Sequence, residues 1–461
     1  MLRVSTVHDP RLDYYLTDLG DELRRVAPGL LVDASRWLGA GAAPLGLDRT
    51  PDRSTVLAVL EGRHPRTGRV LASARRSVVA YDLTFSVPKS VSVLFGLGDR
   101  HAAEAVARAH HDAVAAALGY VERRAAALRW SGPDGQVLVG CDGVVAPAVT
   151  HCLSRAGDPH LHTHVVVANL AHGVDGRWRA LDGRSLFAHA KAAGSLHDAH
   201  LRAALSEGLG ARWSWRGRSG WELEGSDPVA LAALSGRASQ IRQELWALGG
   251  TSRRARHVAW AATREPKAAG PSGAVLRAEW AARSGWAGID LAVGHRDADP
   301  ATLDEHRFAA VIAGAAPSGV CRRDVVAAWA TGAGQGVDGH QLQLAVDHWA
   351  PATADLGVAE PRRAPALVLP PRAALRALGP RPVGVAGQAE WRAAAAAIDR
   401  YRARWGVAFD PSEIGGASLV AFSPARVADH LEVSQLIGEV RVRLGRHHRS
   451  ALERDGHVLG R

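Results

Sequence analysis

Residues 151–170 have the sequence HCLSRAGDPHLHTHVVVANL, and they carry three histidines that can meet on one face of a sheet. The run LHTHVVVANL is rich in β-branched residues, which indicates a strand, and a strand places alternate side chains on the same face. His162 and His164 therefore point the same way, about 7 Å apart at the backbone. His151 ends an earlier apolar run, GVVAPAVTH. If the turn AGDP pairs the two runs, the three imidazoles converge and suit a divalent metal with open coordination positions.

The segments around this stretch predict an α+β fold. The alternation in VVAYDLTFSVPKSVSVLFGL (residues 78–97) predicts one or two strands around Pro88, and the apolar spacing of residues 101–128 predicts a helix. We expect further strands at QVLVG and at the two histidine-bearing runs. Because Pro147 interrupts the run before His151, that strand is expected to bulge or to lie at an edge of the sheet.

Downstream, GRWRALDGRSLF predicts a short strand followed by a helix that runs through Leu209. A hairpin is expected at ARWSWRGRSGWELEG, and residues 228–248 are expected to be helical. We predict a domain over residues 1–295 with a mainly antiparallel sheet flanked by helices and the histidines on neighbouring central strands. Residues 296–461 are Ala-rich and are expected to form a mostly helical C-terminal region.

Composition points to a polyanionic partner, with nucleic acid first, because the net charge is +10. The basic residues are nearly all arginine, which binds phosphate in a bidentate way, although GC-rich coding explains the Arg-to-Lys ratio equally well. The three cysteines have no CxxC spacing, so no disulfide framework is expected and a cytoplasmic location is the default. Neither a signal peptide nor a membrane-inserted segment is expected.

A candidate nucleophile lies near the N-terminus. Two of the five tyrosines, Tyr14 and Tyr15, are adjacent in RLDYYLTDLG. A tyrosine hydroxyl has a pKa of about 10 and needs a metal or a base to attack a substrate. Asp82 is a candidate for that base, because its strand-like run is expected beside the histidine strands.

Together, DLTFSVPKSVSVLF and SRAGDPHLHTHVVVANL resemble the MobF-type (TrwC/TraI-like) conjugative relaxases of the HUH endonuclease superfamily. The resemblance covers residues 10–290 and includes the order of WLGAGAAPLGL, GRWRALD and LSGRASQIRQEL. It implies an HUH relaxase-like fold in which three histidines bind a divalent metal, Mg²⁺ or Mn²⁺ first and Zn²⁺ as the alternative. The implied ligands are His151, His162 and His164. It also implies Tyr14 as the nucleophile, with Tyr15 as the alternative, and Asp82 as the group that helps to activate it.

The activity that this resemblance implies is site- and strand-specific nicking and rejoining of DNA at a transfer origin, through a tyrosyl 5′-phosphate intermediate. The implied partners are single-stranded and duplex DNA, accessory transfer proteins, a coupling protein and a separate helicase. The chain departs from many such relaxases in having no second tyrosine pair over residues 16–36, and no G-x-x-x-x-G-K-[ST] motif of a helicase. The alternatives are a non-cutting accessory protein that binds the origin, and an HUH replication initiator.

Candidate DNA-binding residues have structural alternatives. Arg155 follows His151 closely and is expected either at the scissile phosphate or in an ion pair, and Lys89 either at a backbone phosphate or at a solvated strand end. Basic and aromatic residues alternate in the predicted hairpin, where they can stack bases and bind phosphates or simply pack the hairpin. These residues are Arg212, Trp213, Trp215 and Arg216.

Overall fold

The computed structural model describes most of the first 285 residues and little of the rest. The described ranges are 1–9, 19–72, 76–132, 135–173, 177–249, 252–263, 270–285 and 322–337, with isolated positions from 304 to 397. The chain forms two compact units, one of residues 1–302 with 333–339, the other of residues 303–332 with 340–461. Tyr14 and Tyr15 lie outside the described residues, as does most of the predicted C-terminal region. No described helix is long and apolar enough to span a membrane.

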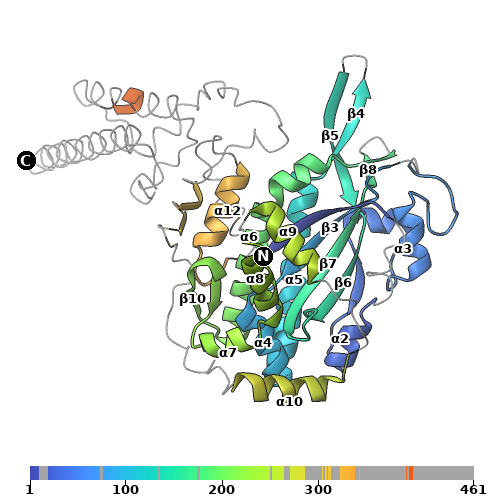
Figure 1. The fold of residues 1–461 in the computed structure, drawn as a ribbon. Coiled ribbons are helices and arrows are strands. Elements are labelled where there is room, and N and C mark those ends of the chain that lie inside the picture. The colour runs from blue at the N-terminus through green and yellow to red at the C-terminus, as the bar shows by residue number, and fades with distance from the viewer. Residues whose placement is uncertain are drawn as a thin grey trace, which may run out of the picture. The chain divides into compact units, whose positions relative to one another are not determined.

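A five-stranded, fully antiparallel sheet forms the centre of the first unit (Figure 1). Its strands, in spatial order, are β1 (Leu2–Val7), β3 (Ala80–Ser86), β7 (Pro159–Ala168), β6 (Ala146–Leu153) and β2 (Ser35–Leu38). This order confirms that the histidine-bearing strands β6 and β7 are neighbours at the centre. Alternating side chains make the two faces of these strands distinct, so one face carries the histidines and the other faces helices.

The expected edge position of β6 is wrong. Pro147 lies opposite Trp37 of β2, and β6 also pairs with β7 from Ala148 onward. The irregularity in the β6–β7 register falls after the histidine instead, between His151 and Leu153. The proline is accommodated because the β7 ladder begins only at the next residue, where a backbone N–H is available.

A smaller sheet has the order β4 (Ala127–Gly132), β5 (Gly135–Val144), β8 (Ala171–Gly173) and β9 (Trp178–Arg179). Strands β4 and β5 extend away from the central sheet as a two-stranded ribbon (Figure 1). The predicted hairpin is present as β10 (Trp213–Trp215) and β11 (Trp221–Leu223), joined through the short 3₁₀ turn η2 (Gly217–Ser219).

Two long helices, α5 (Arg100–Arg124) and α6 (Gly183–Leu209), pack side by side, and α5 and the end of α6 agree with the predicted helices. Residues 228–248, expected to be helical, form two helices, α7 (Pro228–Ala233) and α8 (Gly236–Ala247). The other described helices are α2 (Asp21–Val26), η1 (Ala40–Leu45), α3 (Arg53–Leu60), α4 (Lys89–Leu97), α9 (Arg253–Ala262), α10 (Gly273–Ser284) and, in the second unit, α12 (Arg322–Gly332).

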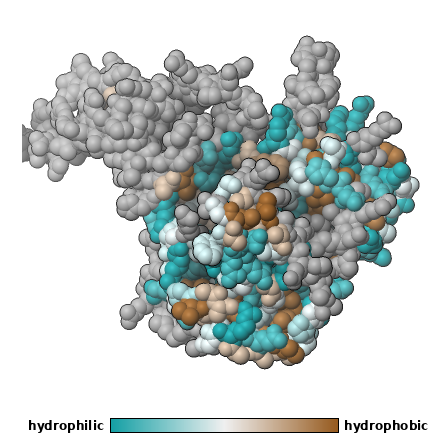
Figure 2. All heavy atoms as spheres, viewed as in Figure 1, coloured by the Kyte–Doolittle hydropathy of each residue, from teal (hydrophilic) through white to brown (hydrophobic). Residues whose placement is uncertain are grey.

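The second strand expected after Pro88 is instead the helix α4, which begins at Lys89. Every residue from Ser90 to Gly96 is buried, so the alternation of valine and serine does not mark an exposed and a buried face. The helix packs its apolar side chains into a core shared with α5 and α10. On the visible surface, apolar residues form small patches separated by hydrophilic ones (Figure 2), as a solvent-exposed surface does.

Candidate active site

Three imidazoles meet on the face of the central sheet opposite to α5 and α6. His151 on β6 lies directly across from His162 on β7, and His164 follows on the same face. The ring centroids are 5.4 Å apart for His151–His162 and His151–His164, and 5.1 Å apart for His162–His164. One nitrogen of each ring lies within 4.8 Å of the others. We call these three residues the histidine triad.

The histidine triad has the chemistry of a metal site. All three side chains are buried, and burial, followed by the nearby His160, His164 and His151 rings, holds the pKa of His162 well below its ordinary value. A neutral ring keeps a lone pair for a metal. The Nδ1 atom of His162 lies 2.8 Å from the His160 carbonyl, so it carries the proton and leaves Nε2 as the ligand atom. Three such donors fit a divalent ion with positions left for substrate.

Asp82 on β3 orients the third imidazole. Nδ1 of His164 lies 3.0 and 3.1 Å from the two carboxylate oxygens of Asp82, and Thr84 Oγ1 lies 3.2 Å from both Nδ1 and Oδ2. A carboxylate only accepts, so His164 carries its proton on Nδ1 and directs Nε2 away from Asp82. Asp82 lies beside the triad, as the sequence predicted. Its direct contact is with His164, whose ring it positions. Its help to a tyrosine stays a prediction.

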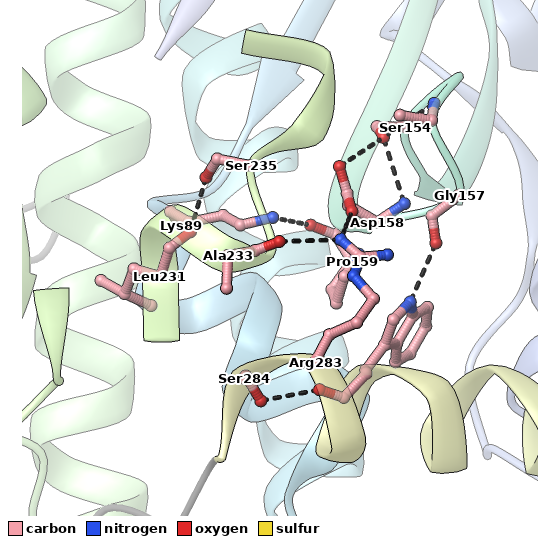
Figure 3. Close-up of polar contacts among 12 residues, drawn as sticks. Lys89, Ser154, Gly157, Asp158, Pro159, Leu231, Ala233, Ser235, Arg283 and Ser284 are labelled. Carbon is pink, nitrogen blue, oxygen red and sulfur yellow. Dashed lines mark hydrogen bonds and ion pairs between the residues drawn. The ribbon is translucent and has the colours of Figure 1, made fainter. Parts of the chain in front are cut away.

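The turn between β6 and β7, residues 154–158, is held by two side chains of one distant helix, α10. Trp280 of α10 donates to the Gly157 carbonyl at 2.9 Å, and Arg283 donates to Asp158 at 2.5 Å and to the Ala233 carbonyl at 2.8 Å. Figure 3 shows the Arg283 side chain reaching between the turn and the end of α7. The Asp158 side chain is only 2% exposed. This clamp fixes the short turn that sets His151 opposite His162.

Lys89 belongs to the same cluster. Its ammonium donates to the Pro159 carbonyl at 2.7 Å, at the start of β7 (Figure 3). Burial, only partly offset by the Asp158 carboxylate, lowers the pKa of Lys89 to about 8. Arg155 lies half-buried in the turn itself. The expected phosphate contacts of Lys89 and Arg155 stay predictions, although the Lys89 side chain is already engaged with protein.

The β10–β11 hairpin combines packing with exposed basic groups. Trp213 is 5% exposed and donates to Ser206 of α6 at 3.1 Å, so its ring belongs to the core. Trp215 lies edge-on to Trp221 at 5.5 Å. Arg212 pairs with Glu224 at 2.9 Å, and Arg216 donates to the Ser226 carbonyl at 3.4 Å. Packing thus accounts for Trp213, and contacts of the hairpin with DNA stay predictions.

Sequence reasoning missed Glu22 of α2. This buried carboxylate accepts the backbone N–H groups of Cys152 and Leu153 at 2.9 and 3.0 Å, where the β6 ladder is irregular just after His151. The contact links segments 130 residues apart, and no local pattern signals it. The position of Thr84 beside the triad could have been predicted from the sequence, because Thr84 follows Asp82 by two residues and shares its face of β3.

The histidine triad lies within the part of the chain that matches known proteins. Residues 9–285 match the sequence profile described as TrwC relaxase. The multifunctional conjugation protein TraI of Escherichia coli is 35% identical over 223 residues, which are 45% of this chain and 12% of that protein, and TraI of strain K12 gives the same figures. The chain therefore matches only about an eighth of the length of these relatives.

Solved structures of the conjugative relaxase TrwC are similar to a larger share of this chain than TraI is. The copper-bound complex with oriT DNA has a TM-score of 0.56 and 30% identity, covering 63% of this chain and 100% of that one. A metal-bound oriT complex has a TM-score of 0.54 at 29% identity, and a complex with a 27-mer of recognition hairpin and cleavage site has 0.53 at 29%, each with the same coverage.

Proposed function

This chain belongs to the TrwC relaxase family, and from that premise we propose that it nicks and rejoins one DNA strand at a transfer origin. The observation that carries the proposal is the buried histidine triad, with Asp82 bonded to His164, inside the matched region. The proposed substrate is single-stranded and duplex origin DNA, since solved TrwC structures contain oriT DNA. The net charge of +10 suits such a substrate.

In this proposal His151, His162 and His164 hold a divalent metal, Mg²⁺ or Mn²⁺ or alternatively Zn²⁺. When bound, such an ion withdraws charge from a non-bridging oxygen of the scissile phosphate. Asp82 keeps the proton of His164 on Nδ1, and the His160 carbonyl does the same for His162. Both rings are thereby held in the tautomer that presents Nε2.

Tyr14, with Tyr15 as the alternative, supplies the nucleophile. Its phenolic oxygen forms a bond to phosphorus while the bond from phosphorus to the 3′ oxygen breaks. The phenolic proton is lost, the 3′ oxygen gains a proton as a free hydroxyl, and the 5′ phosphate stays on the tyrosine as an ester. The reverse reaction rejoins the strand. Accessory transfer proteins, a coupling protein, a separate helicase and a cytoplasmic location are parts of the same proposal.

The test is a nicking assay on a supercoiled plasmid that carries the intergenic DNA next to the gene for this chain. We expect Mn²⁺- or Mg²⁺-dependent conversion to the open circle, with protein joined covalently to one 5′ end. His162→Ala should bind the same DNA without cutting it. Binding without any cut by the wild-type protein would instead identify a non-cutting accessory protein, and cutting only at a replication origin would identify an initiator.

A further inference from the structure

A second polar cluster lies on the opposite face of the two histidine strands. Thr150 and Thr163 are the neighbours of His151 and His162 and pair directly across β6 and β7. Their hydroxyl oxygens are 2.9 Å apart. Because side chains alternate along a strand, this threonine pair lies beneath the histidine pair and faces α5 and α6.

The threonine pair is the middle of a longer series of hydrogen bonds. Oγ1 of Thr163 lies 2.8 Å from Nε2 of His110 on α5, and Nδ1 of His110 lies 3.1 Å from Nε2 of His197 on α6. Nδ1 of His197 lies 2.9 Å from Asp198 Oδ1. At the other end, Oγ1 of Thr150 lies 3.0 Å from Nε2 of His111. We call these six residues the threonine–histidine network: His111, Thr150, Thr163, His110, His197 and Asp198.

The three rings of this network are neutral. Burial, with smaller effects of neighbouring cationic groups, lowers the pKa of His110 well below its ordinary value and that of His111 to about 4. Burial also lowers the pKa of His197, although Asp198 partly opposes the shift. Partial burial alone would raise the pKa of Asp198, but the N-terminal ammonium and His197 hold it below the ordinary value. Asp198 is therefore an acceptor only.

These states give every hydrogen bond in the network one direction. His197 donates Nδ1–H to Asp198, so its Nε2 accepts from Nδ1–H of His110. Nε2 of His110 then accepts a hydrogen bond from the Thr163 hydroxyl. The Thr163 oxygen in turn accepts a hydrogen bond from the Thr150 hydroxyl. The Thr150 oxygen accepts Nε2–H of His111. Reversing any one bond would place two donors or two acceptors face to face elsewhere in the series.

We infer that the threonine–histidine network positions the histidine triad by fixing β6 against β7 in the register that sets His151 opposite His162. The buried network is tolerated only when fully bonded, and a fully bonded network favours one arrangement of its side chains. A slip of one residue between β6 and β7 would send the threonine of the slipped strand to the triad face and break the series. The inference rests on the proposed function for the metal-binding role of the triad.

Thr163→Val tests this inference, since it removes one hydroxyl and keeps the shape of the side chain. Tyr120→Phe is the matched control, because it also removes a buried hydroxyl bonded to an imidazole between α5 and α6, that of His189 at 2.8 Å, outside the network. We expect both variants to lower Tm. Only Thr163→Val should weaken Co²⁺ binding, by about tenfold as outer groups of metal sites do, and change the visible Co²⁺ spectrum. Thr163→Ser keeps the hydroxyl and should show the wild-type Co²⁺ affinity and spectrum.

Wild-type affinity and spectrum in a folded Thr163→Val protein would overturn the inference. A second measurement needs no metal and no variant: imidazole ¹⁵N spectra should show Nδ1–H tautomers for His110 and His197 and Nε2–H for His111. Any other tautomer would also overturn it. If the wild-type protein takes up no Co²⁺, the metal assignment of the proposed function fails. The network is then judged on whether Thr163→Val shifts the His151 and His162 ring signals, and unchanged signals would reject it.

Discussion

Nδ1 of His164 lies 3.0 Å from Oδ1 of Asp82, and this hydrogen bond joins the central strand β7 to its neighbour β3. Both side chains are buried, at 9% and 4% exposed. The bond therefore fixes the direction of the ring in a place where water does not compete for the carboxylate. Asp82, together with Thr84 at 3.2 Å from the same nitrogen, is thus the means by which β3 orients a ring of the candidate metal site.

Asp82→Asn should weaken metal binding by about tenfold and slow nicking without abolishing it. The amide oxygen can still accept Nδ1–H of His164, so the ring stays oriented, but the negative charge that strengthens the bond is lost. Calorimetric Mn²⁺ titration and single-turnover nicking measure the two effects. Asp142→Asn is the matched control, because Asp142 pairs with His172 at 3.5 Å and is 54% exposed. Equal metal affinity of both variants would reject the orienting role.

His162→Ala should separate DNA binding from cutting. It removes one ligand of three, so nicking should fall by at least roughly 100-fold, the upper end of losses caused by changes around a metal. Binding rests on arginine–phosphate contacts and should keep its wild-type salt dependence. Filter binding at several salt concentrations and plasmid nicking are measured on the same preparations, with and without EDTA. Nicking at the wild-type rate by the variant would show that the triad does not hold the required metal.

The site was predictable from sequence where it depends on strand periodicity and a short turn. The spacing of His162 and His164 gave their common face, and the turn between residues 154 and 158 gave the pairing with His151. The helix over residues 89–97 was wrongly predicted as a strand, because a fully buried helix and a buried strand share an apolar composition. Contacts such as Glu22 to the backbone of Leu153 join distant segments, and a single sequence contains no local signal for them.

Arg283→Ala should destabilise the fold by about 1–3 kcal/mol, because it leaves the buried Asp158 carboxylate without its charged donor. The value lies toward the lower end, since the Arg283 side chain is 42% exposed and solvent screens the pair. Arg100→Ala is the control. Arg100 also binds one carboxylate and one carbonyl, those of Glu104 and Gly29, but at a more exposed site, where we expect about 0–1 kcal/mol. Urea unfolding measures both, and equal losses would argue against a clamp on the turn.

Stability should fall with acid below pH 6.5, well before most carboxylates are protonated. Burial and the nearby Arg36 lower the pKa of His111 from 6.5 to about 4 in the folded protein. Between these values the unfolded state binds the proton and the folded state does not, so lowering the pH favours unfolding by up to about 3 kcal/mol from this one residue. His111→Gln keeps a donor for Thr150 without titrating. Its urea midpoint should vary less between pH 7 and pH 5 than that of the wild type, and parallel curves would contradict the assignment.

Tyr14→Phe should abolish the covalent adduct with the 5′ end of a cut single strand, unless Tyr15 replaces it. The substitution removes one hydroxyl and nearly no volume, and a phenyl ring has no oxygen with which to attack phosphorus. Tyr15→Phe and the double variant complete the set, and Tyr120→Phe, a buried tyrosine away from the triad, controls for the loss of a hydroxyl as such. Suicide oligonucleotides followed by mass spectrometry of the trapped peptide identify the tyrosine. Robust cutting by the double variant would mean that water or another side chain is the nucleophile, and the tyrosyl mechanism would be excluded for this chain.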